Sequence, residues 1–279
     1  MKENKKTTLA KNETLSKIAR KFIDLKNNNK LALMPFIMAG DPSIEITSEI
    51  LLELQERGAD LIELGIPYSD PLADGPIIQL AASRALKSGA TPKKVLQLLD
   101  SLKDKLHIPI ILFTYFNPLL SFGFKDFCKL ASSAGVSGLI IPDLPLEEAY
   151  KFSKLVGSYS MDLILLVAPT TPFERMKMIS NSTRGFTYLV SVTGVTGERN
   201  KIENRVENLI TKLKEISPNP VSVGFGISSP EHVSRVRSWG ADGVIIGSAF
   251  VKRISSSTER DVVNQVGNFC KEMRKAADK

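Results

Sequence analysis

Short apolar runs alternate with amphipathic segments along most of this 279-residue chain. Each run is followed by a turn and then by a stretch whose hydrophobic residues recur at helical spacing. The eight runs are 33–39, 60–65, 108–114, 138–141, 163–167, 186–191, 221–225 and 243–246. Because strands that are apolar on both faces belong to parallel sheets covered by helices, the pattern predicts a parallel α/β fold.

Helical spacing is found at about 44–57, 77–87, 92–104, 124–134, 146–156, 173–181, 202–216, 230–239 and 259–276. A further helix is expected before the first run, where Ile18, Phe22 and Leu25 recur at roughly helical spacing. Eight strand–helix units in about 250 residues predict a single (β/α)8 TIM barrel. We place the barrel and its additional N-terminal helix at 13–279, after a flexible N-terminus at 1–12.

A doubly wound sheet is the alternative architecture. Such sheets usually carry a glycine-rich dinucleotide-binding turn after the first strand. The turn here reads Gly40-Asp41-Pro42, which does not match that motif. The segment between the eighth run and the last helix is predicted to be a short turn, with 255–257 as loop.

Composition excludes several classes of function. With 43% hydrophobic and 24% charged residues, the chain has the composition of a globular protein, and no apolar run is long enough to span a membrane. The net charge of +7 comes without an aromatic-interleaved basic patch, so no nucleic-acid partner is expected. Two histidines and two distant cysteines predict no metal site. A cytoplasmic location is expected, with the plastid stroma as the alternative.

A carboxylate stands inside the second apolar run. Glu63 shares a strand face with Leu61, and an unpaired buried carboxylate is costly unless it takes up a proton. Glu63 is either a structural ion-pair or backbone partner, or a functional group. The proline-rich loop that follows carries Asp70 and Asp74. A carboxylate at the strand end together with one on the adjoining loop suits general acid–base chemistry, because different environments can separate their pKa values. We interpret Asp70, which precedes Pro71, as a turn former.

Two glycine-containing turns follow the seventh and eighth runs. In TIM barrels the loops at the carboxyl ends of strands build the active site, and phosphate is usually held after strands seven and eight. Gly226, Gly247 and Ser248 occupy these turns, where backbone N–H groups at a helix start can bind an anion. Ordinary turn chemistry is the alternative, and phosphate binding is favoured.

The loop at 192–201 is long, polar and punctuated by glycine. It is interpreted as a mobile lid, with an ordinary connection as the alternative. Tyr188, in the sixth run, is either a core aromatic residue, which we favour, or a hydroxyl that reaches the pocket. No lysine lies in a strand run, so Schiff-base chemistry is not expected.

The run at 63–76, E-L-G-I-P-Y-S-D-P-L-A-D-G-P, closely resembles the signature of the tryptophan synthase α-subunit family. Seven further motifs support the resemblance in order, and only 1–12 falls outside it. They are P-F-I-M-A-G-D-P at 35–42, Y-F-N-P at 115–118, I-P-D-L-P at 141–145, A-P-T-T-P at 168–172, S-V-T-G-V-T-G at 191–197, G-F-G-I-S at 224–228 and G-S-A-F-V at 247–251.

This resemblance implies a retro-aldol cleavage of indole-3-glycerol phosphate to indole and D-glyceraldehyde 3-phosphate. It implies that Glu63 is the principal acid/base, that Asp74 stabilises the protonated indole, and that Thr196 on the lid binds Asp74. Tyr188 would line the pocket beside Glu63. The implied phosphate ligands are Gly197, Gly226, Gly247 and Ser248, and the implied indole-facing wall is Phe36, Phe225 and Ile78.

The resemblance also implies a partner, a β subunit that uses pyridoxal phosphate, in an α2β2 heterotetramer. No cofactor is then expected in this chain, and the loops around 70–75 and after strands three to six would form the docking face. Two positions depart from relatives: Tyr68 replaces a frequent Phe, and Val192 replaces a basic residue that some relatives carry. A free-standing lyase and a non-catalytic phosphate-ligand module that activates a partner are the alternative functions.

Overall fold

The computed structural model describes residues 15–190, 199–224 and 226–278. The N-terminal segment predicted to be flexible, most of the predicted lid, and Phe225 lie outside the described residues. Thr196, Gly197 and Val192 lie outside them as well. The remaining predicted site residues are all described.

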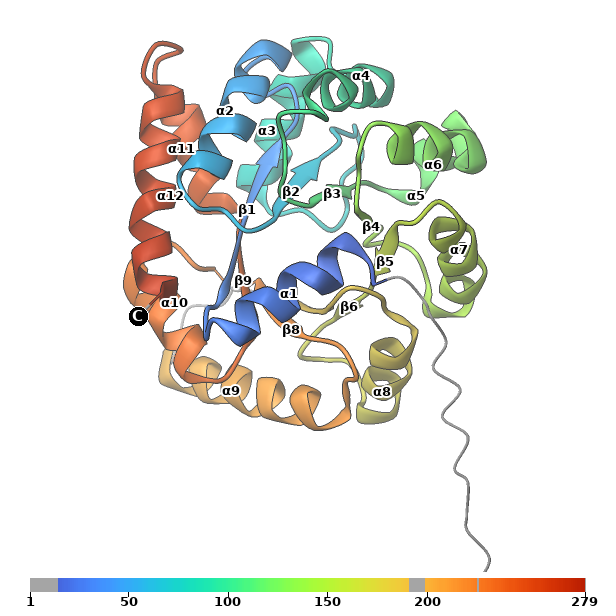
Figure 1. The fold of residues 1–279 in the computed structure, drawn as a ribbon, viewed down its shortest axis with the longest axis vertical. Helices are drawn as coiled ribbons and strands as arrows, with labels where there is room; N and C mark the ends of the chain where they lie inside the picture. The colour runs from blue at the N-terminus through green and yellow to red at the C-terminus, as the bar shows by residue number, and fades with distance from the viewer. Residues whose placement is uncertain (1–14, 191–198, 225, 279) are drawn as a thin grey trace, which may run out of the picture.

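The strands of the described chain form one parallel sheet. They are β1 Ala32–Met38, β2 Ile62–Gly65, β3 Ile110–Phe113, β4 Gly138–Ile140, β5 Asp162–Ile164, β6 Leu166–Val167, β7 Thr187–Val190, β8 Val221–Gly224 and β9 Gly243–Ile246. Their order is β5-β4-β3-β2-β1-β9-β8-β7-β6. The two ends of this order, β5 and β6, are consecutive pieces of one run interrupted at Leu165. The order therefore returns to its start, and the predicted eight-stranded barrel is confirmed (Figure 1).

Helices surround this ring of strands. They are α1 Lys17–Asn27, α2 Ile44–Glu56, α3 Pro76–Lys87, α4 Pro92–Leu102, α5 Phe116–Phe122, α6 Phe124–Ser133, α7 Leu146–Ser158, α8 Phe173–Ser182, α9 Arg199–Ile216, α10 Pro230–Ser238, α11 Ser248–Ser256 and α12 Val262–Asp278. The additional N-terminal helix is α1. Among the described helices, none is both long and apolar enough to cross a membrane.

Two short helices occupy segments for which the sequence pattern predicts no helix. α5 begins at Phe116, and Pro118 sits in its first turn, where a missing N–H costs no helical hydrogen bond. α11 covers most of the segment between the eighth strand and the last helix, and it buries Phe250, Val251 and Ile254 on one side. Both helices are too short for their apolar spacing to stand out in the sequence.

The barrel interior is arranged in layers. Because side chains alternate along β2, Leu61 and Glu63 point inward while Leu64 packs in the cluster between the strands and the outer helices. Leu61 lies in the inner cluster together with Ile18 and Phe22 of α1. Helix α1 crosses the ring of strands in Figure 1 and packs its apolar face into the barrel. Glu63 therefore lies one layer closer than Leu61 to the carboxyl ends of the strands.

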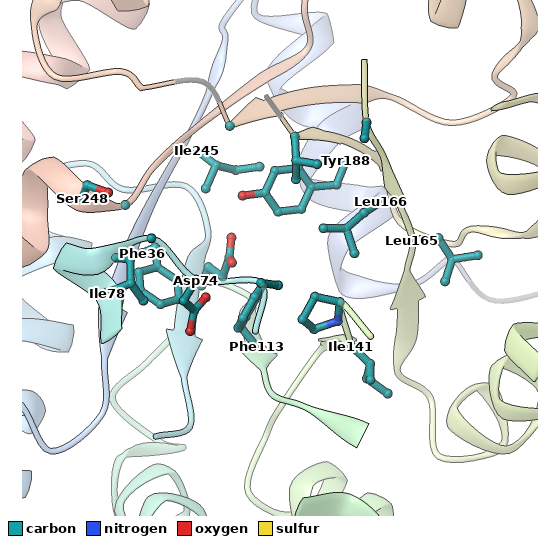
Figure 2. A pocket seen from close by; sticks show the side chains of 18 of the residues that line it. Phe36, Asp74, Ile78, Phe113, Ile141, Leu165, Leu166, Tyr188, Ile245 and Ser248 are labelled. Carbon is teal, nitrogen blue, oxygen red and sulfur yellow. The ribbon is translucent and has the colours of Figure 1, made fainter. Parts of the chain in front are cut away.

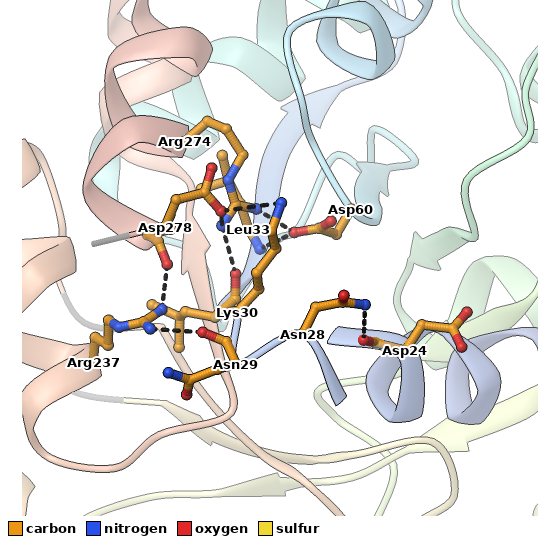
Figure 3. Close-up of polar contacts among 11 residues, drawn as sticks. Asp24, Asn28, Asn29, Lys30, Leu33, Asp60, Arg237, Arg274 and Asp278 are labelled. Carbon is orange, nitrogen blue, oxygen red and sulfur yellow. Dashed lines mark hydrogen bonds and ion pairs between the residues drawn. The ribbon is translucent and has the colours of Figure 1, made fainter. Parts of the chain in front are cut away.

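A polar cluster ties the C-terminal helix to the start of the first two strands (Figure 3). Arg274 of α12 pairs with Asp60, which immediately precedes Leu61, and also donates to the carbonyl of Leu31. Asp60 in turn accepts the N–H of Leu33 at 2.9 Å. Arg274 is only 13% exposed, so water screens this pairing weakly. The cluster holds β1 and β2 side by side at the amino end of the barrel.

The loop after β1 is held against α3 by a charged pair. Arg84 donates to both oxygens of Asp41, at 2.8 and 2.7 Å, and Asp41 is 1% exposed. The Ser88 hydroxyl donates to the carbonyl of Gly40 at 2.7 Å. Because α3 begins directly after the loop that carries Asp74, these contacts help to fix one wall of the barrel mouth.

Candidate active site

A cavity of about 940 Å³ opens at the carboxyl ends of the strands. Its walls come from nearly every strand–helix connection of the described chain, as the rule for TIM barrels requires. Of the predicted site residues, the structure places the following in the walls: Phe36, Glu63, Asp74, Ile78, Tyr188, Gly226, Gly247 and Ser248. Figure 2 shows Asp74, Tyr188 and Ser248 arranged around this common space.

Glu63 is a buried carboxyl group without a structural partner among the described residues. It is 3% exposed, and its Oε2 has no hydrogen-bond partner there. Burial raises the pKa of Glu63 to about 8, and the charge of Asp74 adds to the effect. The ion-pair and backbone-bonded alternatives for Glu63 therefore find no support, and the group holds its proton at neutral pH.

Asp74 lies at the end of the proline-rich loop, where its N–H donates to the carbonyl of Pro71 at 3.0 Å. Burial raises the pKa of Asp74 to about 6, and a hydrogen bond from the Tyr115 hydroxyl opposes that rise. Asp74 is therefore mostly ionised at neutral pH, in contrast to Glu63. Asp70, in the same loop, is exposed and does not line the cavity, as its interpretation as a turn former predicts.

Tyr188 combines the two roles that the sequence left open. Its ring packs in the inner cluster and it is 8% exposed, while Figure 2 shows its hydroxyl pointing into the cavity. Burial raises the pKa of Tyr188, and the charges of Glu63 and Asp74 raise it further. Gly224 makes room for this side chain, because a Cβ there would lie 2.7 Å from the Tyr188 hydroxyl.

The two glycine turns form one side of the cavity. Gly226 has φ +44°, a left-handed backbone conformation that favours glycine. Gly247 precedes α11, which has no side-chain N-cap, and Ser248 is its first residue. A Cβ on Gly247 would meet its nearest neighbour, Phe36, at 3.7 Å, so internal packing does not require a glycine there. The N-terminus of α11 thus presents backbone donors and a positive dipole end to the cavity.

The remaining wall of the cavity is largely apolar. Phe36 and Ile78, predicted from the resemblance, line it together with Phe113, which packs edge-on against Phe36 at 5.8 Å. Sequence reasoning missed Phe113, Leu166, Val190 and Ile245, all of which line the cavity. Each lies at or near the carboxyl end of a strand, and this shared position is the signal that could have identified them.

Tyr115 is the functional residue that sequence reasoning missed most clearly. It follows the third strand closely, is 2% exposed, and accepts the N–H of Ala73 at 3.0 Å. Because Ala73 immediately precedes Asp74, this bond ties Tyr115 to the backbone that carries the Asp74 carboxylate. The position after a strand marks Tyr115 for the barrel mouth, but α3, α4 and β3 separate it from Asp74 along the chain, and no sequence pattern links the two.

Comparison with known proteins adds the family to this geometry. The family model described as tryptophan synthase alpha chain matches residues 22–278, which is nearly the whole described chain. The chain belongs to the tryptophan synthase alpha chain family. Its α reaction is a carbon–carbon lyase step of tryptophan biosynthesis, so the chain is a lyase.

Named relatives of this family cover nearly all of the chain. The tryptophan synthase alpha chain of Prochlorococcus marinus subsp. pastoris is 81% identical over 278 residues, covering 100% of both chains. That of a Synechococcus species is 61% identical and covers 94% of this chain and 98% of its own. The crystal structure of tryptophan synthase subunit alpha from Legionella pneumophila superposes with a TM-score of 0.86 at 36% identity, covering 95% of this chain and 99% of that one. These matches leave no room for the doubly wound alternative.

The family context gives Tyr68 a defined place. Its hydroxyl, which is the departure noted in the sequence, accepts a hydrogen bond from the Asn117 side chain at 3.1 Å. Its ring lies against that of Tyr115, with centroids 5.5 Å apart. The second departure from the tryptophan synthase alpha chain pattern, Val192, lies outside the described residues.

Proposed function

We propose that this chain cleaves indole-3-glycerol phosphate to indole and D-glyceraldehyde 3-phosphate, with Glu63 and Asp74 as its acid–base groups. One observation carries the proposal: the carboxyl groups of Glu63 and Asp74 line the same cavity, and Glu63 is only 3% exposed. Glu63, with a pKa of about 8, is an acid, and Asp74, with a pKa of about 6, is an anion. Such a pair matches a reaction that needs a proton donor and a site for positive charge.

The first step is a proton transfer to the indole ring. Glu63 donates its proton to the ring carbon that bears the glycerol phosphate side chain, and the ring becomes a cationic indolenine. The positive charge spreads to the ring nitrogen. The Asp74 carboxylate accepts a hydrogen bond from that N–H and stabilises the cation. Glu63 is buried and Asp74 is half-buried, so charge–charge interactions between these groups and the ring are stronger than in water.

The second step breaks the carbon–carbon bond. The Glu63 carboxylate, now ionised, removes the proton of the hydroxyl on the first side-chain carbon. The bond from that carbon to the ring breaks, its electrons neutralise the indolenine, and the hydroxyl carbon becomes the aldehyde. Glu63 ends the cycle protonated, so the carboxyl group that starts the reaction is restored without an external acid or base.

Substrate orientation follows from the two kinds of wall in the cavity, the glycine turns and the apolar side chains. We place the phosphate at the N-terminus of α11 and in the turn after β8, where Gly226, Gly247 and Ser248 line the cavity. We place the indole against Phe36 and Ile78. Thr196 and Gly197 of the predicted lid would complete the site from the segment outside the described residues. The reaction as proposed needs no cofactor in this chain.

An indole-release assay tests this function against its alternatives. The purified chain is incubated with indole-3-glycerol phosphate, and indole and glyceraldehyde 3-phosphate are quantified with and without added β subunit. We expect both products in equal amounts from the chain alone. Failure of the chain to release indole under either condition would favour the non-catalytic module. Full activity that β subunit neither binds nor changes would identify a free-standing lyase.

We further propose a β-subunit partner that carries pyridoxal phosphate and receives indole directly, in an α2β2 heterotetramer. Exposed apolar side chains at the barrel mouth support a docking surface there. Leu72, in the loop after β2, is 82% exposed, and Leu120 of α5 is 53% exposed. Large apolar residues grouped on one face of a protein mark interaction surfaces.

Replacing Leu72 with Asp is expected to weaken β-subunit binding about 10- to 100-fold, because a buried leucine contributes roughly 1.5–3 kcal/mol. Isothermal titration calorimetry with the β subunit measures the change. Leu130→Asp is the matched control, since Leu130 is 47% exposed but lies in the last turns of α6, away from the mouth. Equal affinities for the wild type and Leu72→Asp would place the docking surface elsewhere.

A further inference from the structure

Tyr115 is clamped between two aromatic rings beside the cavity. Phe113 meets it edge-on at 6.1 Å, and Tyr68 lies on it at 5.5 Å with a tilt of 36°. Its hydroxyl accepts the N–H of Ala73, the residue before Asp74, at 3.0 Å. The same hydroxyl can donate its own proton while it accepts this bond, because a phenol has one proton and two lone pairs. The ring contacts and the Ala73 bond therefore hold the Tyr115 hydroxyl beside Asp74, where it lowers the pKa of that carboxyl group.

The outer ring of this clamp has an anchor of its own. Tyr68 is only partly buried, so packing alone does not fix its ring. The Asn117 amide donates to the Tyr68 hydroxyl at 3.1 Å. Asn117 belongs to α5, which begins directly after Tyr115, so this bond connects the β2 loop to the helix that follows β3. Rotation of Tyr68 away from Tyr115 would break it.

We propose that Tyr115 is the positioning residue that holds the Asp74 carboxylate in its working geometry, and that Tyr68, anchored by Asn117, holds Tyr115. The inference deepens the proposed function, because it rests on the role given to Asp74. Tyr115 does not line the cavity, so it acts through Asp74 and not on the substrate. The contacts run in one chain, from Asn117 through Tyr68 and Tyr115 to Asp74.

The groups around Asp74 decide what the loss of this chain would do. Asp74 itself supplies negative charge here, which acts on Glu63 of β2 and on Tyr115, and Asp143, after β4, also acts on Tyr115. Tyr188 faces both cavity carboxyl groups as a neutral phenol. Tyr115 is thus the hydrogen-bond donor that favours the Asp74 anion against burial. Without it, Asp74 should hold its proton up to a higher pH.

Tyr115→Phe tests the inference, because it removes one oxygen and keeps the ring. We measure kcat, KM and their pH dependence for the full chain with saturating β subunit. We expect kcat to fall about threefold near pH 6.5 and about tenfold near pH 5, with the acid limb of the kcat profile moved up by about one pH unit. KM should change less than about twofold, since phosphate binding is untouched. Tyr68→Phe should move the limb in the same direction by about 0.3 pH unit, because water competes for its bond.

A variant with both Tyr68→Phe and Tyr115→Phe shows whether Tyr68 acts through Tyr115 or independently of it. If Tyr68 acts only through Tyr115, adding Tyr68→Phe to Tyr115→Phe should cause no further shift. Tyr159→Phe is the control, because Tyr159 is also partly buried but caps the far end of α7. A wild-type acid limb in Tyr115→Phe would overturn the inference, even if thermal stability falls. Wild-type turnover in Asp74→Asn would instead overturn the proposed function on which it rests.

Discussion

Replacing Glu63 with Gln is expected to lower the rate of indole release by about 10³- to 10⁴-fold, the upper part of the range for general acid–base catalysis. The loss should be this large because Glu63 acts twice, first as the acid on the ring carbon and then as the base on the hydroxyl. The amide can do neither. Steady-state kinetics measure kcat, and binding of glycerol 3-phosphate, used as a phosphate probe, should stay within about twofold of the wild type.

Glu63→Gln should also change how the stability of the protein depends on pH. The folded-state pKa of Glu63, about 8, lies above its ordinary value of 4.5. Its contribution to stability is therefore complete below pH 4.5 and is lost as the pH rises through 8. Glu63→Gln has no proton to lose, so it should be more stable than the wild type at pH 9 by on the order of 5 kcal/mol.

Urea unfolding at pH 5 and pH 9 measures this difference, which should nearly vanish at pH 5. Arg57 forms an ion pair with Glu53 at 2.6 Å on α2, so Glu53→Gln serves as a control that removes a carboxylate without touching the cavity. Normal turnover in Glu63→Gln would contradict the catalytic assignment. A stability gain equal at both pH values would contradict the raised pKa.

Replacing Asp74 with Asn is expected to lower kcat about 10²-fold and to change the shape of its pH profile. In the wild type, activity should fall as the pH drops through about 6, where Asp74 takes up a proton, and as it rises through about 8, where Glu63 loses one. The uncharged amide accepts only a weaker hydrogen bond from the cationic ring, and it does not titrate in this range. The acid limb should therefore disappear.

The alkaline limb of Asp74→Asn should move as well. The Asp74 charge helps to raise the pKa of Glu63, so its removal should shift that limb downward, although burial remains the larger cause. Profiles of kcat between pH 5 and 9 contain both effects. An acid limb that persists in Asp74→Asn would assign it to another group, and an unmoved alkaline limb would show that the two carboxyl groups act independently.

Most of the fold could be predicted because its signal is local. Eight apolar runs, each followed by a helical pattern, leave few architectures other than a barrel, and each predicted run overlaps an observed strand. What could not be predicted is equally specific. The interruption at Leu165 divides one run into β5 and β6, and its N–H donates instead to the Thr183 hydroxyl at 2.9 Å. That bond depends on a residue outside the strand.

The candidate site could be predicted where the identity of a single residue is unusual for its place in the sequence. Glu63 stands out because it is an acidic residue in an apolar run, but the sequence does not show whether a partner for its carboxyl group lies across the barrel. The structure shows that its Oε2 has no hydrogen-bond partner among the described residues. Nothing in the sequence around Tyr115 indicates a role, because its contact is with the loop after β2, which approaches it only in the folded structure. Phe113 escaped notice for the opposite reason, since an apolar residue in a strand is the ordinary case.

The cluster of Arg274 and Asp60 has a consequence for the order of biosynthesis. β1 and β2 leave the ribosome early, but Arg274, which bonds Asp60 and the Leu31 carbonyl, is made only when α12 is translated. β1 also lacks its second neighbour, β9, until shortly before then. The strand that carries Glu63 must therefore wait for the end of translation before its surroundings are complete. A nascent chain stopped before α12 would expose those first strands to chaperones or to aggregation.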